Sequence, residues 1–142
     1  MLNDLYRQLI MEHAGQKRNH REMKEGSHLH YKNPTCGDVM TLYWKWNEDG
    51  TLEEVSFIGE GCSISMASCS MMTEMVKGKN YEEITAMREG MEQLIRRGEE
   101  PREIDLGDAL SLAGVYRLRA RHNCALMPWQ ALDRAFLKET AR

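Results

Sequence analysis

Long hydrophobic runs are absent from this 142-residue sequence. No segment reaches the roughly 18 apolar residues that a membrane-spanning helix needs. Residues 1–7 alternate charged and apolar side chains, without the continuous apolar stretch of a secretory signal. The sequence therefore predicts a cytoplasmic protein with no membrane partner.

An excess of positive charge is also missing. The 19 lysines and arginines are balanced by 22 acidic residues, which gives a formal net charge of −3. No basic stripe with interleaved aromatic residues, as nucleic-acid binding requires, is found in the sequence. We therefore expect no nucleic-acid partner.

Internal repeats and low-complexity tracts are lacking, and nothing divides the chain into two units. We expect a single domain over residues 1–142. A chain of this length can bury a core without help from disulfides or a structural metal, so a metal here would serve function before stability.

Cysteine is scarce, with four residues in the chain. Cytosolic thiols are kept reduced, so these cysteines are metal ligands, nucleophiles or core residues more often than disulfides. Seven residues separate Cys69 from Cys62, about 10 Å along a helix, which is too far for both sulfurs to bind one zinc ion. We expect Cys69 to be a packing residue.

The hydrophobic pattern predicts an α+β fold in which several helices pack on a small antiparallel sheet. Alternation over residues 39–46 and the apolar run at 52–58 indicate a hairpin with its turn at Asp49-Gly50. Helical spacing predicts five helices: residues 2–15, 63–78, about 84–95, a short run from 106 to 118, and a last helix that begins at or near Pro128. Residues 16–38 are expected to form a polar connector.

The outer ends of the two hairpin strands meet in space, which predicts a metal site at one edge of the sheet. Cys36 and Asp38 precede the first strand, and Cys62 follows the second at a helix start, where the helix dipole favours a thiolate. Cys124 follows Arg119, Arg121 and His122, an electropositive stretch that has the same effect.

Cys36, Asp38, Cys62 and Cys124 make a Cys3Asp set that suits tetrahedral Zn²⁺, with iron or an iron–sulfur cluster as the competing occupant. Zinc with these four ligands carries a formal charge of about −2, by counting ligands. Arg121 is placed to offset that charge. A solvated surface arginine is the alternative for this residue.

Three runs in the sequence resemble the cysteine motifs of U-type iron–sulfur cluster assembly proteins: residues 33–38, 59–68 and 121–125. Within this family the chain is most similar to the SufU branch, on the stretches 106–109 and 113–115 and on the long spacer between Cys62 and Cys124. The scaffold branch, IscU, carries a histidine immediately before its third cysteine, where this chain has Asn123.

The resemblance implies a zinc-dependent sulfurtransferase that accepts persulfide sulfur from a pyridoxal-phosphate cysteine desulfurase and passes it to a downstream iron–sulfur assembly scaffold. It implies that Cys36 is the sulfur acceptor and that Asp38, Cys62 and Cys124 complete the zinc shell. In the family, a histidine of the desulfurase is thought to replace the acceptor thiol on zinc. Arg121 matches an arginine of the third motif, with a role in docking or in balancing the thiolates.

Some residues depart from the family pattern, notably residues 14–19 after the first helix and Cys69, which replaces a small residue. Two alternative functions stay open. One is a scaffold that assembles a [2Fe–2S] cluster on the same ligands, against which Asn123 argues. The other is a zinc domain that only docks another protein.

Overall fold

The computed structural model describes the backbone of residues 2–35 and 37–140, and the side chains of residues 3–35 and 37–136. In chain order the elements are α1 (Leu2–Gly15), β1 (Ser27–Lys32), β2 (Val39–Trp46), β3 (Leu52–Glu60), α2 (Ser63–Val76), α3 (Tyr81–Glu92), the π-helical turn η1 (Gln93–Arg97), the 3₁₀ segments η2 (Gly107–Arg117) and η3 (Arg119–Arg121), and α4 (His122–Thr140). The predicted α+β class is confirmed.

The sheet is a three-stranded antiparallel meander in the order β1-β2-β3. The predicted hairpin pairs Val39 with Glu60 at its open end. At its closed end, Gly50 has a φ of +87°, a conformation that glycine adopts without strain. Side chains of Met40, Leu42 and Trp44 are buried on one face of β2, as the alternation predicts.

Strand β1 was predicted wrongly as part of a polar connector. Only Leu29 and Tyr31 of β1 face the core, while His28, His30 and Lys32 are exposed. One apolar pair is too short a pattern to indicate a strand. The edge of the hairpin supplies the missing driving force, because β2 offers unpaired backbone groups along Val39 to Trp44.

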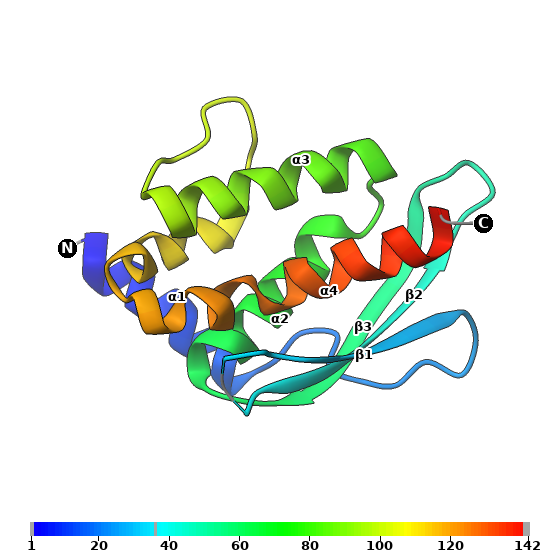
Figure 1. Cartoon of the computed structure of the whole chain (residues 1–142), viewed down its shortest axis with the longest axis horizontal. Helices are drawn as coiled ribbons and strands as arrows, with labels where there is room; N and C mark the ends of the chain where they lie inside the picture. Colours follow the sequence, from blue (N-terminus) through cyan, green and yellow to red (C-terminus); the bar gives the residue numbers. More distant parts are fainter. Residues whose placement is uncertain (1, 36, 141–142) are drawn as a thin grey trace.

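The helices lie together on one side of the sheet, with α2 and α4 running between the sheet and α3 (Figure 1). Helix α2 is buried on nearly all sides, from Ser65 to Thr73. The predicted single apolar stripe on this helix is therefore too narrow. Its many serines and small residues permit close packing of the neighbouring elements around it.

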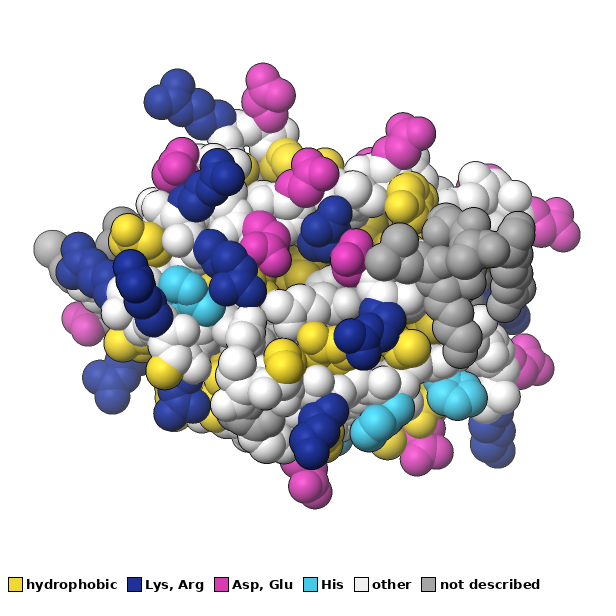
Figure 2. All heavy atoms as spheres, viewed as in Figure 1, with side chains coloured by type: hydrophobic (Ala, Val, Ile, Leu, Met, Phe, Trp, Pro, Cys, Tyr) yellow, Lys and Arg dark blue, Asp and Glu magenta, His cyan; other side chains and the backbone are white. Residues whose placement is uncertain are grey.

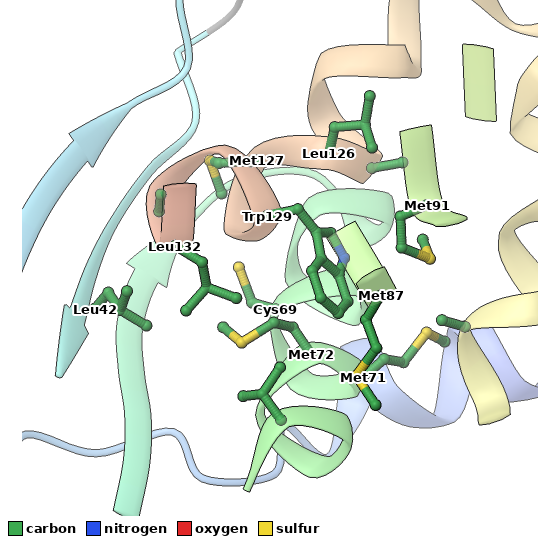
Figure 3. Close-up of a cluster of buried hydrophobic side chains, with 14 of the residues drawn as sticks. Leu42, Cys69, Met71, Met72, Met87, Met91, Leu126, Met127, Trp129 and Leu132 are labelled. Atoms are coloured by element: carbon green, nitrogen blue, oxygen red, sulfur yellow. The ribbon is translucent and has the colours of Figure 1, made fainter. Parts of the chain in front are cut away.

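The core between α2, α3 and α4 is rich in methionine. Figure 3 shows Trp129 of α4 beside Met87 and Met91, with Met71 and Met72 of α2 below it. Methionine is flexible and fills irregular gaps around a rigid indole ring. This packing joins the three helices in one hydrophobic cluster with the inner face of the sheet.

The start of α4 differs from the prediction. The helix begins at His122 and continues through Pro128, which lies inside it, so Cys124 lies in the first helical turn and not on a turn before the helix. An internal proline costs about 3 kcal/mol because it cannot donate to the carbonyl four residues earlier. Complete burial of Leu126, Met127 and Trp129 offsets this cost.

The other helices agree with the expected ranges, with differences in type. Helix α3 ends at Glu92, and the π-turn η1 carries the chain on to Gly98, which adopts the left-handed conformation. The run after Leu106 is a 3₁₀ helix. Within the described residues, no helix is both long and apolar enough to cross a membrane.

Candidate metal centre

Asp38, Cys62 and Cys124 converge at the open end of the hairpin. One carboxylate oxygen and the two sulfurs lie within 4.8 Å of one another. Ligands of one tetrahedral zinc ion stand about 3.5–4 Å apart, given Zn–S and Zn–O bonds of roughly 2.3 and 2.0 Å. The three donors therefore fit a zinc site after a small closure of their side chains.

Cys36 was predicted as the fourth ligand and as the sulfur acceptor, but it lies outside the described residues. Its neighbours in the sequence are described. The amide of Asn33 donates to the carbonyl of Asp38 at 2.9 Å, and the side-chain oxygen of Asn33 accepts from the amide of Thr35 at 3.1 Å. The turn that carries Cys36 is therefore closed at its base, next to Asp38.

Cys62 caps the N-terminus of α2. Its sulfur accepts from the amide of Ser65 at 3.5 Å, and the Ser65 hydroxyl donates to the Cys62 carbonyl at 3.0 Å. The amides at this helix end orient the sulfur toward Asp38 and Cys124, with which it could hold a metal ion. The sequence prediction of a thiol at a helix start is thus confirmed, with Ser65 as a partner that it missed.

Gly61 permits the close approach of α2 to Asp38. A Cβ atom at Gly61 would lie 2.6 Å from Asp38 Cγ and 2.5 Å from Ser65 Oγ. No real Cβ atom tolerates such contacts, so any larger residue would move Asp38 or Cys62. The glycine of this motif is required by the spacing of the site, not by its own backbone angles.

Cys124 enters the site from the first turn of α4 and is buried. Arg121, one turn earlier and exposed, extends toward both thiols. A hydrogen bond to Cys124 is the main cause that raises the pKa of the Arg121 guanidinium, followed by the negative charges of Cys62 and Cys124. The sequence left two roles open for Arg121: to offset the charge of the site, or to be a solvated surface residue. Its contacts with the two thiols favour the first role.

Cys69 stands apart from the candidate ligands. It is fully buried, and its sulfur lies 3.7 Å from Met40 Sδ. Burial, with smaller contributions from Asp38 and Cys62, raises the pKa of its thiol. A thiol held in its neutral form within the core is a packing residue, as the sequence predicts.

Asn123 has contacts near the site that the sequence did not predict. In the sequence it was notable only because the scaffold branch has a histidine at this position. Its amide oxygen accepts from Arg96 at 2.8 Å, and its amide nitrogen donates to the Thr35 hydroxyl at 3.3 Å. Asn123 thereby connects α4 to the turn that carries Cys36. Only a three-dimensional contact could reveal this role, because 88 residues separate Asn123 from Thr35.

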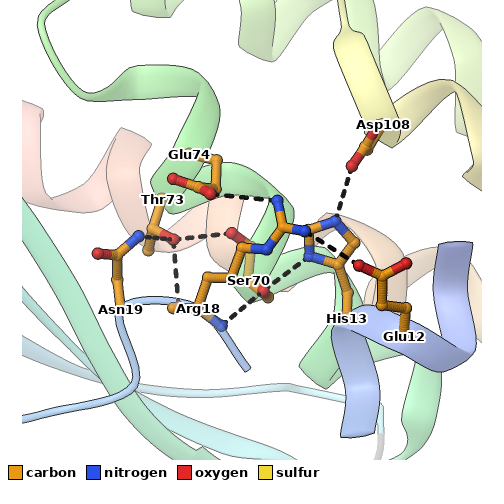
Figure 4. A network of polar contacts seen from close by, with 8 residues as sticks. All are labelled: Glu12, His13, Arg18, Asn19, Ser70, Thr73, Glu74 and Asp108. Atoms are coloured by element: carbon orange, nitrogen blue, oxygen red, sulfur yellow. Dashed lines mark hydrogen bonds and ion pairs between the residues drawn. The ribbon is translucent and has the colours of Figure 1, made fainter. Parts of the chain in front are cut away.

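A second polar cluster, the His13 network, lies on the middle of α2 (Figure 4). The buried His13 ring bonds Ser70 Oγ at 2.8 Å and Asp108 at 2.9 Å. Arg18 pairs with Glu12 and Glu74, and its amide donates to Ser70 Oγ. Arg18 and Asn19, in the stretch that departs from the family pattern, therefore contact α2, and Asp108 ties η2 to α1.

Comparison with known proteins connects this geometry to a family. Residues 5–125 match the family described as NifU-like N terminal domain. The zinc-dependent sulfurtransferase SufU of Bacillus subtilis (strain 168) is 42% identical over 138 residues, which cover 97% of this chain and 93% of that protein.

Two further relatives carry a scaffold name. The iron–sulfur cluster assembly scaffold protein IscU of Streptococcus pyogenes serotype M1 is 38% identical over 134 residues, 94% of this chain and 84% of that protein. A solved structure from Fervidobacterium islandicum AW-1, assigned to the SUF system as an iron–sulfur cluster assembly scaffold, has a TM-score of 0.79 at 30% identity and covers 88% of this chain and 91% of its own. With the three donors gathered at one end of its sheet, the chain belongs to the NifU-like N-terminal domain family.

Proposed function

We propose that this protein is a zinc-dependent sulfurtransferase that takes sulfur from a persulfide on a cysteine desulfurase and delivers it to iron–sulfur cluster assembly. One observation carries the proposal: Asp38, Cys62 and Cys124 place three negatively chargeable donors within 4.8 Å of one another. The resemblance to the sulfurtransferase SufU over nearly the whole chain supports the same reading.

Asp38, Cys62 and Cys124 would hold the metal together with Cys36. Zinc, when bound, keeps its thiol ligands deprotonated and protects them from oxidation without redox chemistry of its own. Thiolate donors favour zinc over calcium or magnesium. The donor set therefore suits a metal that stores a nucleophile.

Cys36 would act as the nucleophile. Its thiolate attacks the terminal sulfur of the donor persulfide, forming a new S–S bond on Cys36 while the donor's S–S bond breaks. The donor cysteine leaves as a thiolate, so one neutral sulfur atom moves and no external oxidant or reductant is consumed. Arg121, beside Cys62 and Cys124, would stabilise the negative charge that gathers in the site.

The location and the extent of the domain belong to the same proposal. Cys62, Cys69 and Cys124 are free thiols, which is typical of a cytoplasmic protein. A single hydrophobic cluster shared by sheet and helices supports one domain over residues 1–142.

The experiment is metal analysis of the purified protein, followed by mass spectrometry after incubation with a cysteine desulfurase and cysteine. We expect one zinc per chain and a mass increase of one sulfur on Cys36. The increase should vanish in Cys36→Ala and persist in the matched control Cys69→Ala. Zinc without any sulfur uptake would reduce the protein to a docking domain.

A scaffold for [2Fe–2S] assembly is the second candidate, favoured by the scaffold names of two relatives. Asn123 argues against it, because it stands where the scaffold branch has histidine and its amide is engaged by Arg96 and Thr35. Iron with acid-labile sulfide in the purified protein, and visible absorbance after anaerobic reconstitution, would establish the scaffold in place of the transferase.

A further inference from the structure

A short exposed segment precedes the metal centre and combines positive with apolar side chains. Residues 116–121, which we call the arginine segment, are all exposed. Their sequence is Tyr-Arg-Leu-Arg-Ala-Arg, so three arginines fall within five positions of a chain whose net charge is −3. The local charge is thus opposite to that of the whole molecule.

The apolar members of this segment are unusually open to solvent. Tyr116 is 44% and Leu118 is 52% exposed, and they are two of the five large hydrophobic side chains that are exposed in the described part of the chain. Isolated exposed leucines are common, but a leucine between two exposed arginines forms a mixed patch of the composition found at protein interfaces.

The backbone of the segment is held in place. Leu118 donates its amide to Val115 at 2.8 Å, Arg121 donates to Leu118 at 2.8 Å, and the His122 ring bonds the Tyr116 carbonyl at 2.8 Å. The Tyr116 ring packs closely over Gly98, where a Cβ atom would lie 2.8 Å from it. A fixed backbone loses little conformational entropy when a partner binds.

The charges of the segment are available to a partner. Neither Arg117 nor Arg119 forms an ion pair with any residue that the structure describes. Arg121 is different, because it is engaged by Cys124 and Cys62. Among the described residues, the arginine segment therefore carries two unpaired arginines, Arg117 and Arg119, and reaches the thiols through Arg121.

Figures 1 and 2 place this segment in the molecule. The orange stretch before α4 forms one end of the molecule, at the left in Figure 1. In Figure 2, dark-blue side chains gather over the same end. A protein that approaches the thiols from this side meets positive charge first.

We infer that the arginine segment is a docking surface for the sulfur donor, and that it fits an apolar patch bordered by Asp and Glu side chains around the donor's reactive cysteine. This inference rests on the proposed function, which requires that cysteine to reach the metal centre. Arg117 and Arg119 would pair with the carboxylates, and Leu118 would bury its side chain between them. Charge complementarity of this kind steers encounter and fixes orientation.

The test compares two double charge reversals of equal net charge. R117E/R119E changes the arginine segment without touching Arg121, and K24E/R102E changes two exposed residues elsewhere, Lys24 beside the closed end of the hairpin and Arg102 in the loop before η2. Both variants should keep one zinc per chain and the wild-type circular dichroism spectrum, which shows that the fold and the site are intact.

Binding to a purified cysteine desulfurase of the same organism is then measured by titration calorimetry at 50 and 300 mM salt. We expect the Kd of R117E/R119E to rise at least about tenfold at low salt, with a weaker salt dependence than the wild type. K24E/R102E should bind like the wild type. Leu118→Gln should weaken binding at both salt concentrations, because its contribution is apolar.

An equal Kd for R117E/R119E and the wild type, or no binding by the wild type, would overturn the inference. Failure of the proposed function gives a different result: the wild type binds the donor, but Cys36 gains no sulfur. The alternative partner for the arginine segment is a second copy of this chain. Its acidic cavity of about 520 Å³ would then receive the arginines, because it is lined by Glu74, Glu83, Glu103, Asp105 and Asp108. Sedimentation velocity tests this alternative. If the wild type forms salt-sensitive dimers that R117E/R119E abolishes, and donor binding is unchanged, the partner is a second copy of this chain and the inference about the sulfur donor is wrong.

Discussion

The two polar clusters along α2, one at its N-terminus and one in its middle, differ in how their charges are balanced. At the N-terminus, Asp38, Cys62 and Cys124 bring three groups that become negative within 4.8 Å. In the middle of the helix, the His13 network pairs donors with acceptors, including Arg18 with Glu12 and Glu74. A network whose groups satisfy one another stabilises the fold, whereas a cluster of negative groups, which Arg121 offsets in part, favours a bound cation. The His13 network therefore serves structure, whereas the cluster at the helix N-terminus is suited to bind a metal.

The largest effect should come from removing a thiol at the metal centre. Cys124→Ser replaces a thiolate with a hydroxyl that stays protonated, so zinc affinity should fall by more than about 100-fold, beyond the loss typical of an outer-shell change. Competition with a chromogenic chelator measures the affinity. The matched control, Cys69→Ala, should keep one zinc per chain, and zinc loss in that variant would contradict the separation of Cys69 from the site.

His13→Ala should have the opposite profile. It removes a buried ring, the partner of Asp108 and one of the two partners of Ser70 Oγ, so the free energy of unfolding should fall by about 2–3 kcal/mol. Urea denaturation of the zinc-loaded protein measures this change, while the zinc content should stay at one per chain. His28→Ala, at an exposed histidine of β1, should change stability by less than about 0.5 kcal/mol. Zinc loss in His13→Ala at constant stability would erase the distinction between the two clusters.

Gly61→Ala tests whether the spacing at the metal centre depends on a missing side chain. The new methyl group would collide with Asp38 and Ser65. We expect zinc affinity to fall by roughly tenfold, as for other changes that misplace a ligand. Gly114→Ala is the control, since a Cβ atom there meets no atom within 4 Å. Equal zinc affinity for both variants would show that Asp38 moves freely or does not bind the metal.

The smallest effect concerns the contact between Asn123 and Thr35. A double-mutant cycle of Asn123→Ala and Thr35→Ala, with zinc affinity as the readout, should give a coupling energy of about 0.5–1 kcal/mol, the usual size for one exposed hydrogen bond. Strictly additive effects of the two substitutions would show that Asn123 does not position the Cys36 turn.

The hairpin, and with it the meeting of Asp38 and Cys62 at its open end, could be predicted from the sequence because the signals are local. Alternation over residues 39–46, a turn at Asp49-Gly50 and cysteines beside the strand ends determine which groups meet. Strand β1 could not be predicted, since its stability comes from an edge that β2 provides. The start of α4 was wrong for a related reason: burial of Leu126 and Trp129 outweighs the local effect of Pro128.

The His13 network and the contact of Asn123 with Thr35 were beyond the reach of sequence reasoning. The partners of His13, and the Asn123–Thr35 pair, are 57 to 95 residues apart, and a histidine, a serine or an asparagine carries no signal of its own partner. Ser65 is the exception. It follows Cys62 by three residues at a helix start, and that spacing is typical of a side chain that caps the helix.

The candidate ligands Asp38, Cys62 and Cys124 come from widely separated parts of the chain. During synthesis the sheet and the start of α2 emerge well before the thiol of Cys124. A growing polypeptide can thus present Cys36, Asp38 and Cys62 to the metal, but not the full set of four proposed ligands. Under the proposed function, tight binding of zinc would therefore wait until α4 has packed, so that a retained metal would mark a completed fold.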